Sequence, residues 1–140
     1  GGFMKVEELL NSYNEIKTKV ELLEIDIADC ISLGNKNIDD PLPGKVSARS
    51  NTSVVERQAV RIEDMQAELR MCKRLIEKIN ILLNTLSDEE RKFIQAIYFE
   101  HKRMVDLSIR YHTSLDTMYK RKAVILKKLE KYYNYVITTL

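Results

Sequence analysis

The sequence predicts an all-α protein, in which a long N-terminal antiparallel helical hairpin or coiled coil precedes a C-terminal helix-turn-helix domain. The chain of 140 residues holds only four Gly and two Pro, and 31% of it is charged, a composition typical of helical proteins. Apolar residues recur at alternating spacings of three and four over two long stretches. Three shorter helical patterns follow between Leu86 and Leu129.

The first long helix is predicted from an unbroken heptad seam over four heptads. Its members are Val6, Leu9, Tyr13, Ile16, Val20, Leu23, Ile27 and Cys30. We expect the helix to end at Gly34, just past Leu33, because glycine commonly follows the last helical turn.

The second long helix repeats the same rhythm. Its seam consists of Val55, Gln58, Ile62, Met65, Leu69, Cys72, Ile76, Ile79, Leu83 and Leu86. Ser53 and Glu56 have the spacing of a capping box and predict the start of this helix. Residues 34–52, which include Pro41, Pro43 and Gly44, are expected to form a mobile loop. The hairpin therefore spans residues 4–85, and pairing of these helices between subunits is the alternative.

The seams fit a structural coiled coil, or a dimerisation element or docking arm for a protein partner. Cys30 and Cys72 lack the spacing of a zinc site and are expected to be reduced thiols in a cytoplasmic protein. No run of apolar residues is long enough to span a membrane. Residues 1–3, before Met4, are interpreted as an expression scar.

No enzymatic signature stands out. The chain has no glycine-rich phosphate loop, nucleophile elbow or paired-carboxylate pattern, so we expect neither an enzyme nor a cofactor. His101 and His112 have no partner spacing, and no metal site is expected.

The C-terminal domain, residues 86–140, carries the basic surplus of the chain. From Ser87 to Leu140 there are eleven Lys and Arg against seven Asp and Glu, a net charge of +4. The remaining residues hold twelve basic and fourteen acidic side chains, a net charge of −2. An electrostatic footprint for DNA is expected where such a surplus gathers.

Three helices are predicted in this domain. Ser87 with Glu90 predicts a capped start for the first, which should end near residues 100–102. A short second helix is expected over 104–111, followed by a turn at 112–113, where histidine tolerates a positive φ. Ser114 is the predicted N-cap of the third helix.

The core of the domain is predicted from helical spacing. The expected members are Phe93, Ile94, Ile97, Tyr98, Val105, Leu107, Tyr111, Met118, Ala123, Leu129, either Ile125 or Leu126, and Ile109 as a further candidate. A heptad step through Lys122, Ile125, Leu129, Tyr132 and Val136 extends the third helix. This extension either packs back on the domain or forms a subunit interface.

The candidate DNA contacts lie mainly in the first two turns of the third helix, because base edges are read from there. They are Ser114, Asp116, Thr117, Tyr119, Lys120, Arg121 and Lys122, with Lys127 and Arg103 as further cations. Asp116 could accept from cytosine, Lys120 could donate to guanine, and the Thr117 methyl could touch thymine. The alternative is a solvated basic helix face.

These residues resemble region 4 of sigma-70-type factors, which reads the −35 promoter element. The matching residues are Leu86, Glu89, Glu90, Arg91, Tyr98, Phe99, Ser114, Thr117, Met118, Arg121, Ala123, Leu126 and Leu129. With its N-terminal coiled coil, the chain is similar in architecture to small phage late-transcription regulators of the ArpU and RinA type. His112 departs from the usual turn glycine, and Leu115 from a polar residue at the head of the recognition helix.

The resemblance implies a prophage-encoded, sequence-specific regulator that binds double-stranded DNA as a homo-oligomer in the bacterial cytoplasm, with RNA polymerase as a further candidate partner. The alternative is a coiled-coil adaptor that contacts RNA polymerase or another protein without reading DNA. A phage packaging subunit with a similar DNA-binding domain is a third hypothesis. A continuous basic face around Arg103, Lys120 and Lys127 would favour DNA.

Overall fold

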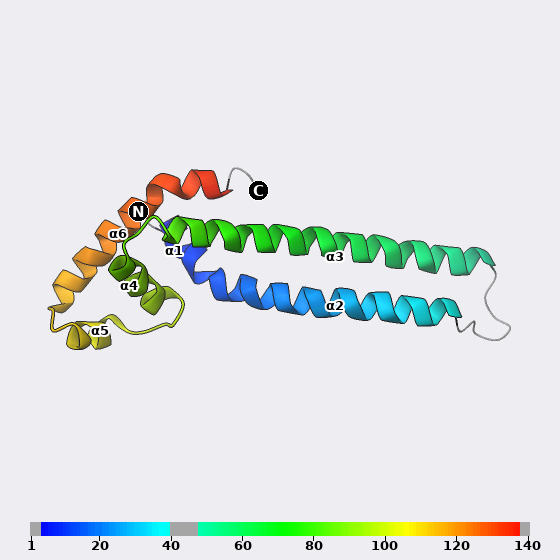
Figure 1. Ribbon diagram of the computed structural model, residues 1–140, viewed down its shortest axis with the longest axis horizontal. Helices are drawn as coiled ribbons and strands as arrows, with labels where there is room; N and C mark the ends of the chain where they lie inside the picture. Colours follow the sequence, from blue (N-terminus) through cyan, green and yellow to red (C-terminus); the bar gives the residue numbers. More distant parts are fainter. Residues whose placement is uncertain (1–3, 40–47, 138–140) are drawn as a thin grey trace. The chain divides into compact units, whose positions relative to one another are not determined.

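The computed structural model describes the backbone of residues 4–39 and 48–137, and the side chains of residues 5–33 and 54–137. Every regular element in these ranges is a helix, which confirms the predicted all-α class. The helices are α1 (Met4–Asn11), α2 (Tyr13–Asp39), α3 (Ala48–Leu83), α4 (Asp88–Tyr98), α5 (Met104–Arg110) and α6 (Leu115–Ile137) (Figure 1). The predicted expression scar at 1–3 and the predicted mobility of residues 40–47 lie outside the described residues.

The chain divides into two compact units. The head comprises Gly1–Ile16 and Arg74–Leu140, and the arm comprises Lys17–Lys73. The boundaries of these two units differ from the single boundary at residue 85 that the heptad pattern predicts. Both ends of that pattern, in α1 and at the end of α3, pack within the head.

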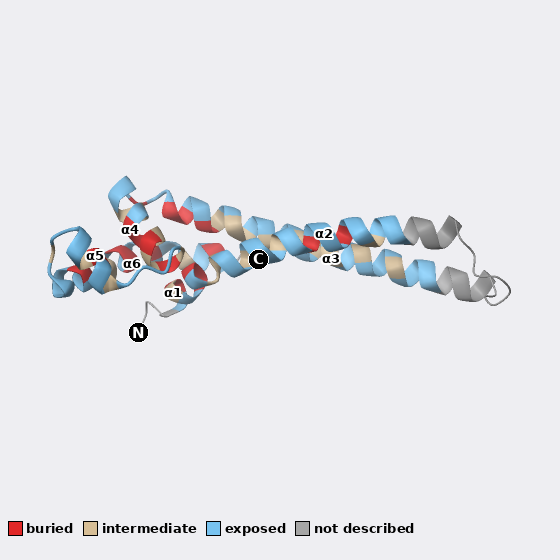
Figure 2. Ribbon diagram, turned by 90° about the horizontal axis from the view of Figure 1, so that it is seen from below, coloured by how far each residue is buried: buried red, intermediate tan, exposed pale blue. Residues whose placement is uncertain are grey.

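In the arm, α2 and α3 lie side by side and run in opposite directions (Figures 1 and 2). Lys19 forms an ion pair with Glu68 of the facing helix, and Lys73 with Glu24 at 3.6 Å. The predicted seam of α2 is confirmed between residues 17 and 33. Its four members there are buried or half-buried, and every other residue in this range is exposed.

Both arm helices continue into residues 34–52, which the sequence predicts to be a loop. α2 continues through Gly34 to Asp39, and α3 begins at Ala48, so Ser53 lies inside α3 rather than at its start. A glycine inside a helix costs only about 1 kcal/mol.

The first heptad helix is interrupted at Ser12, between α1 and α2, where the spacing had predicted continuity. The Ser12 hydroxyl donates a hydrogen bond to the Leu9 carbonyl at 2.7 Å. Such a local bond competes with the helical ladder and bends helices. Spacing alone does not reveal this interruption, because the seam residues keep their period across it.

The head is built around one hydrophobic core to which five helices contribute (Figure 2). The inner face of α6 supplies Met118, Ile125, Leu126, Leu129 and Val136. The other buried members are Val6, Leu9 and Leu10 of α1, Ile79, Leu82 and Leu83 of α3, Leu86, Phe93, Ile94, Ala96 and Tyr98 at α4, and Leu107 of α5.

Three apolar residues of the second short helix and its turn do not join this core, contrary to the prediction. Val105, Ile109 and Tyr111 are 50%, 67% and 44% exposed, and only Leu107 of α5 is buried. A helix of seven residues presents barely two turns, and besides Leu107 only Met104 among the described residues of α5 packs against the core. Ala123 is half-buried.

The C-terminal extension of α6 packs back on the head. Val136 is buried in the core, and its carbonyl accepts a hydrogen bond from Lys78 Nζ at 3.2 Å. Tyr133 packs against the core, whereas Tyr132, on the predicted heptad step, is 43% exposed. Packing within the head therefore accounts for the buried residues of the extension.

The turn between α5 and α6 depends on His112, whose φ of 52° confirms the predicted positive value. The His112 N–H donates to the Ile109 carbonyl at 3.2 Å, and the Thr113 N–H to the Ser108 carbonyl at 2.9 Å. These two bonds form the Schellman arrangement that closes helix ends, with histidine in the place of the usual glycine. His101, after α4, also has a positive φ, of 56°.

Replacing His112 tests this turn. His112→Val should lower the free energy of unfolding by about 1–2 kcal/mol, because a β-branched residue resists positive φ. His112→Gly should leave it unchanged within about 0.5 kcal/mol or raise it, since glycine accepts this conformation. Thermal unfolding followed by circular dichroism compares the two variants. Equal melting temperatures for the valine and glycine variants would contradict this account of the turn.

Candidate nucleic-acid interface

The start of α6 is fixed by Ser114, as predicted. The Ser114 Oγ accepts a hydrogen bond from the Thr117 N–H at 3.2 Å and donates one to Thr117 Oγ1 at 2.8 Å. The cap satisfies one free amide of the first turn, and the helix N-terminus remains favourable to negative charge. Asp116 and Thr117 are exposed in this turn.

The outer face of α6 carries a stripe of cations. Lys120, Lys127 and Lys131 are exposed and follow one another at i, i+7 and i+11, with Val124 at i+4 between them. Lys120 Nζ lies 3.2 Å from Asp116 Oδ2, with both side chains more than three-quarters exposed. An ion pair so exposed is worth at most about 1 kcal/mol, so Lys120 is readily available to an anionic partner. Lys127 forms no ion pair within the described chain.

The Lys122 side chain lies apart from the stripe of cations on the outer face of α6. Its side chain is only 22% exposed, and its Nζ lies 3.8 Å from Glu7 Oε1 of α1. The same Nζ lies 5.8 Å from the ring centroids of Tyr98 and Tyr119. Lys122 thus connects α6 to α1 and is separated from the outer stripe.

The Tyr98 hydroxyl lies in this inner region. It is buried and has no hydrogen-bond partner among the described residues. Burial, followed by the negative charge of Glu7, raises the pKa of Tyr98 above its ordinary value of 10.0. The phenol therefore stays neutral at physiological pH.

Arg103 precedes α5 and is engaged locally. Its Nε and one terminal nitrogen donate to the two carboxylate oxygens of Asp106, at 3.0 and 3.3 Å. Tyr119 is 50% exposed on α6. Of the sequence-predicted contacts, the structure gathers Asp116, Lys120 and Lys127 on one face, and leaves Arg103 in a pair of its own.

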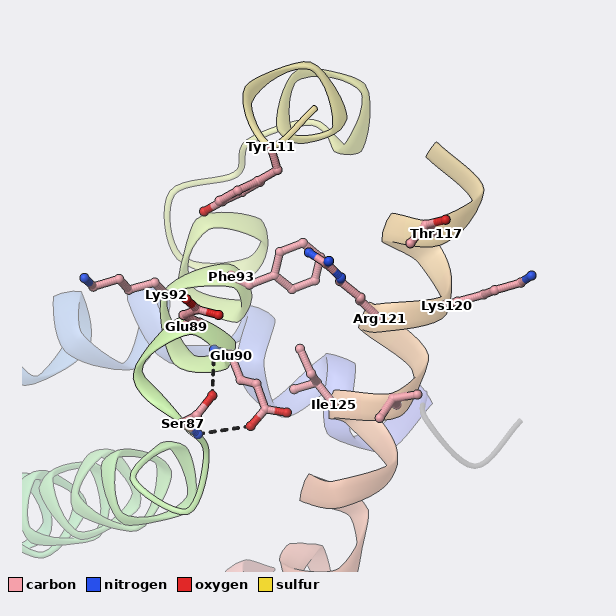
Figure 3. Close-up of a pocket in the computed structure, with 11 residues that line it drawn as sticks. Ser87, Glu89, Glu90, Lys92, Phe93, Tyr111, Thr117, Lys120, Arg121 and Ile125 are labelled. Atoms are coloured by element: carbon pink, nitrogen blue, oxygen red, sulfur yellow. Dashed lines mark hydrogen bonds between the residues drawn. The ribbon is translucent and has the colours of Figure 1, made fainter. Parts of the chain in front are cut away.

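A groove of about 670 Å³ lies beside the stripe, between α4 and the first turns of α6 (Figure 3). Phe93 and Ile125 are its buried apolar lining, and Tyr111 borders it. The Arg121 side chain extends into the space between the two helices (Figure 3). Lys120 also lines the groove, with its ammonium group pointing away from that space. Arg121 is exposed and forms no ion pair or hydrogen bond within the described chain.

Glu90 anchors one side of this groove to α6. Its carboxylate completes the capping box by accepting from the Ser87 N–H at 3.0 Å, and the Glu90 N–H donates to Ser87 Oγ at 3.2 Å. The predicted cap of α4 is thereby confirmed. Lys128 Nζ donates to the other Glu90 oxygen. The hydrogen bond from Lys128, followed by that from the Ser87 N–H, lowers the pKa of Glu90 below its ordinary value of 4.5.

Sequence reasoning missed the groove and the contribution of α1. Lys92 of α4 and Tyr111, which directly follows α5, both line the groove, but no local pattern encodes the approach of these two segments. Glu7 lies outside the heptad seam of the predicted first helix. Glu7 and Lys122 form an ion pair although they lie far apart in the sequence, and no periodic pattern predicts a pair of this kind.

The site and fold define an all-helical protein with a basic, serine-capped helix on the surface of its head. A family model described as protein of unknown function, DUF722, matches residues 4–131, and the chain belongs to this family. No curated protein and no solved structure matches the chain.

Among the described residues, none of the helices combines the length and apolar character needed to cross a membrane. The same residues contain no group of three or more His, Cys, Asp or Glu placed to hold a metal ion.

The Glu90–Lys128 contact predicts a pH dependence. Because the pKa of Glu90 is lowered in the folded state, its contribution to stability is present above pH 4.5 and is lost as the pH falls through the folded-state value. Lys128→Gln should therefore reduce the free energy of unfolding near pH 7, and the difference from wild type should shrink below pH 4.5. Urea unfolding between pH 7 and pH 3 measures this. Lys127→Gln, a neighbouring exposed lysine, is the control, and an equal effect at both positions would contradict the prediction.

Proposed function

We propose that the protein is a DNA-binding transcription regulator that places α6 in the major groove of double-stranded DNA. The observation that carries this proposal is the exposed cation stripe on α6, which follows the serine-capped start of the helix in the sequence. Cations on one face neutralise phosphates, and the exposed first turn supplies groups that can reach base edges.

The arrangement of α4, α5 and α6 supports a helix-turn-helix interpretation. The second helix is short, the turn is tight and closed by His112, and the third helix is long and basic. Leu107 of α5 and Met118 of α6 are fully buried in the shared core, which holds the two helices as one module. In such modules the third helix reads the groove.

The DNA surface we propose consists of Ser114, Asp116, Thr117, Lys120 and Lys127, with Arg121 at its border. Lys120 and Lys127 would contact phosphates on either side of the groove, and Asp116 and Thr117 would lie closest to the bases. Lys122 is left out of this surface, because it is directed toward Glu7. More specifically, we propose a regulator that resembles sigma region 4 and is encoded by a prophage. It would act as a homo-oligomer, with or without RNA polymerase.

A protein-interaction adaptor is the second candidate. It is favoured by one observation, the exposure of Val105 and Ile109 at i and i+4 on α5. An apolar pair on an outer helix face suits a protein contact better than a phosphate contact.

Replacing Lys120 and Lys127 together by Ala tests the DNA proposal. Affinity for a 30-base-pair random-sequence duplex, measured by fluorescence anisotropy at several salt concentrations, should fall at least about tenfold at low salt. The slope of log affinity against log salt should become shallower by about 2, since two phosphate contacts are lost.

Arg61→Ala with Arg70→Ala removes two exposed cations from the arm and serves as the charge-matched control. Its affinity and salt slope should equal those of the wild type. If both double variants weaken binding equally, nonspecific attraction to net charge explains the result. If neither changes it, or the wild type does not bind, the adaptor is the better account.

A further inference from the structure

A second surface of the chain is acidic and apolar. On α2, residues 20–33 contain four acidic side chains and no Lys or Arg. Leu22, Ile25, Asp26, Asp29 and Leu33 recur at i, i+3, i+4, i+7 and i+11, and all five are exposed. We call these five residues the acidic stripe.

The acidic stripe is distinct from the seam that packs against α3. The seam members Leu23 and Ile27 are buried, whereas Leu22 and Ile25 are 57% and 58% exposed. The side chains of the five stripe residues form no ion pair or hydrogen bond within the described chain. Large apolar side chains at helical spacing, flanked by unpaired carboxylates, are typical of a helix face that docks into a groove.

The groove of the head has the complementary character. Its lining combines Phe93, Ile125 and the half-exposed ring of Tyr111 with the unpaired guanidinium of Arg121 (Figure 3). Lys92 adds a second exposed cation at its edge. Of the two acidic residues that line it, Glu90 is neutralised by Lys128, which leaves Glu89. The groove therefore suits a ligand with apolar side chains and carboxylates.

We propose that the groove binds the acidic stripe of a second copy of this chain. Leu22 and Ile25 would enter between α4 and α6 against Phe93, and Asp26 and Asp29 would face Arg121 and Lys92. Charge complementarity between two surfaces that one chain carries in equal number favours a second copy as the occupant. Two copies arranged reciprocally occupy both grooves with both stripes, which closes the assembly as a dimer. The inference of this contact does not rest on the proposed DNA binding, although Thr117, Lys120 and Arg121 line the groove and also belong to or border the proposed DNA surface.

Charge reversal in the full-length chain tests the contact without DNA. Sedimentation equilibrium between 1 and 100 µM should give twice the 16.4 kDa chain mass for the wild type at the upper end of this range. Lys92→Glu with Arg121→Glu, and Asp26→Arg with Asp29→Arg, should each raise the dimer Kd at least about tenfold. Combining all four substitutions should restore it to within about threefold, because the charges are exchanged across the interface.

Glu63→Arg with Asp64→Arg, on exposed positions of α3, is the control for charge reversal in the arm and should leave the Kd unchanged. Circular dichroism of each variant verifies that the helices remain folded. A wild-type monomer at 100 µM overturns the proposal, and so does a dimer insensitive to Lys92→Glu with Arg121→Glu. Weakening by both variants without recovery in the combination excludes the acidic stripe as the occupant. A monomer whose melting temperature falls in both variants and recovers in the combination assigns the occupant to the same chain, which also overturns the proposal.

Discussion

Burial of the inner face of α6 is the interaction on which the head depends. Met118, Leu126 and Leu129 are at most 1% exposed, and α1, α4, α5 and the end of α3 contribute the residues that surround them. Each fully buried side chain of this kind contributes roughly 1.5–3 kcal/mol. Because this face is fixed inward, the face that carries Lys120, Lys127 and Lys131 is held toward solvent. The core therefore determines which cations are available to a partner.

The N-terminal residues complete the head from the far end of the sequence. Val6 and Leu10 enter the core, and the Tyr13 ring stacks on Phe99 with centroids 4.2 Å apart. The Asn14 side-chain amide donates to the Phe99 carbonyl at 2.8 Å. The arm is thus an insertion in sequence between two parts of one packed unit. A deletion of the whole predicted hairpin, residues 4–85, would therefore also remove residues that the head needs.

Much of the local structure could be predicted from the sequence, because it depends on neighbouring residues. The caps at Ser87 and Ser114, the positive φ of His112 and the seam of α2 each follow from a short pattern. The break at Ser12 and the continuation of α2 through Gly34 did not follow, since spacing does not register a single side-chain hydrogen bond or the modest cost of one glycine.

The candidate site, too, could be predicted from the sequence only where it depends on local spacing. Spacing could place Lys120 and Lys127 on one face of a helix, but it could not separate Lys122 from them, because that depends on Glu7 more than one hundred residues earlier. The groove is a property of three-dimensional packing between α4 and α6, and its lining comes from helices that no single pattern connects. Residues assigned to the core by periodicity, such as Phe93, proved also to line a surface feature.

The central claim is that the outer face of α6 binds DNA, and amide shift mapping tests it most directly. The isotope-labelled full-length protein would be titrated with a 30-base-pair duplex and followed by ¹⁵N-resolved NMR. The account predicts that the largest changes occur between Ser114 and Lys131, with little change between Lys17 and Lys73. Changes confined to the arm, or binding that leaves residues 114–131 unaffected, would contradict it.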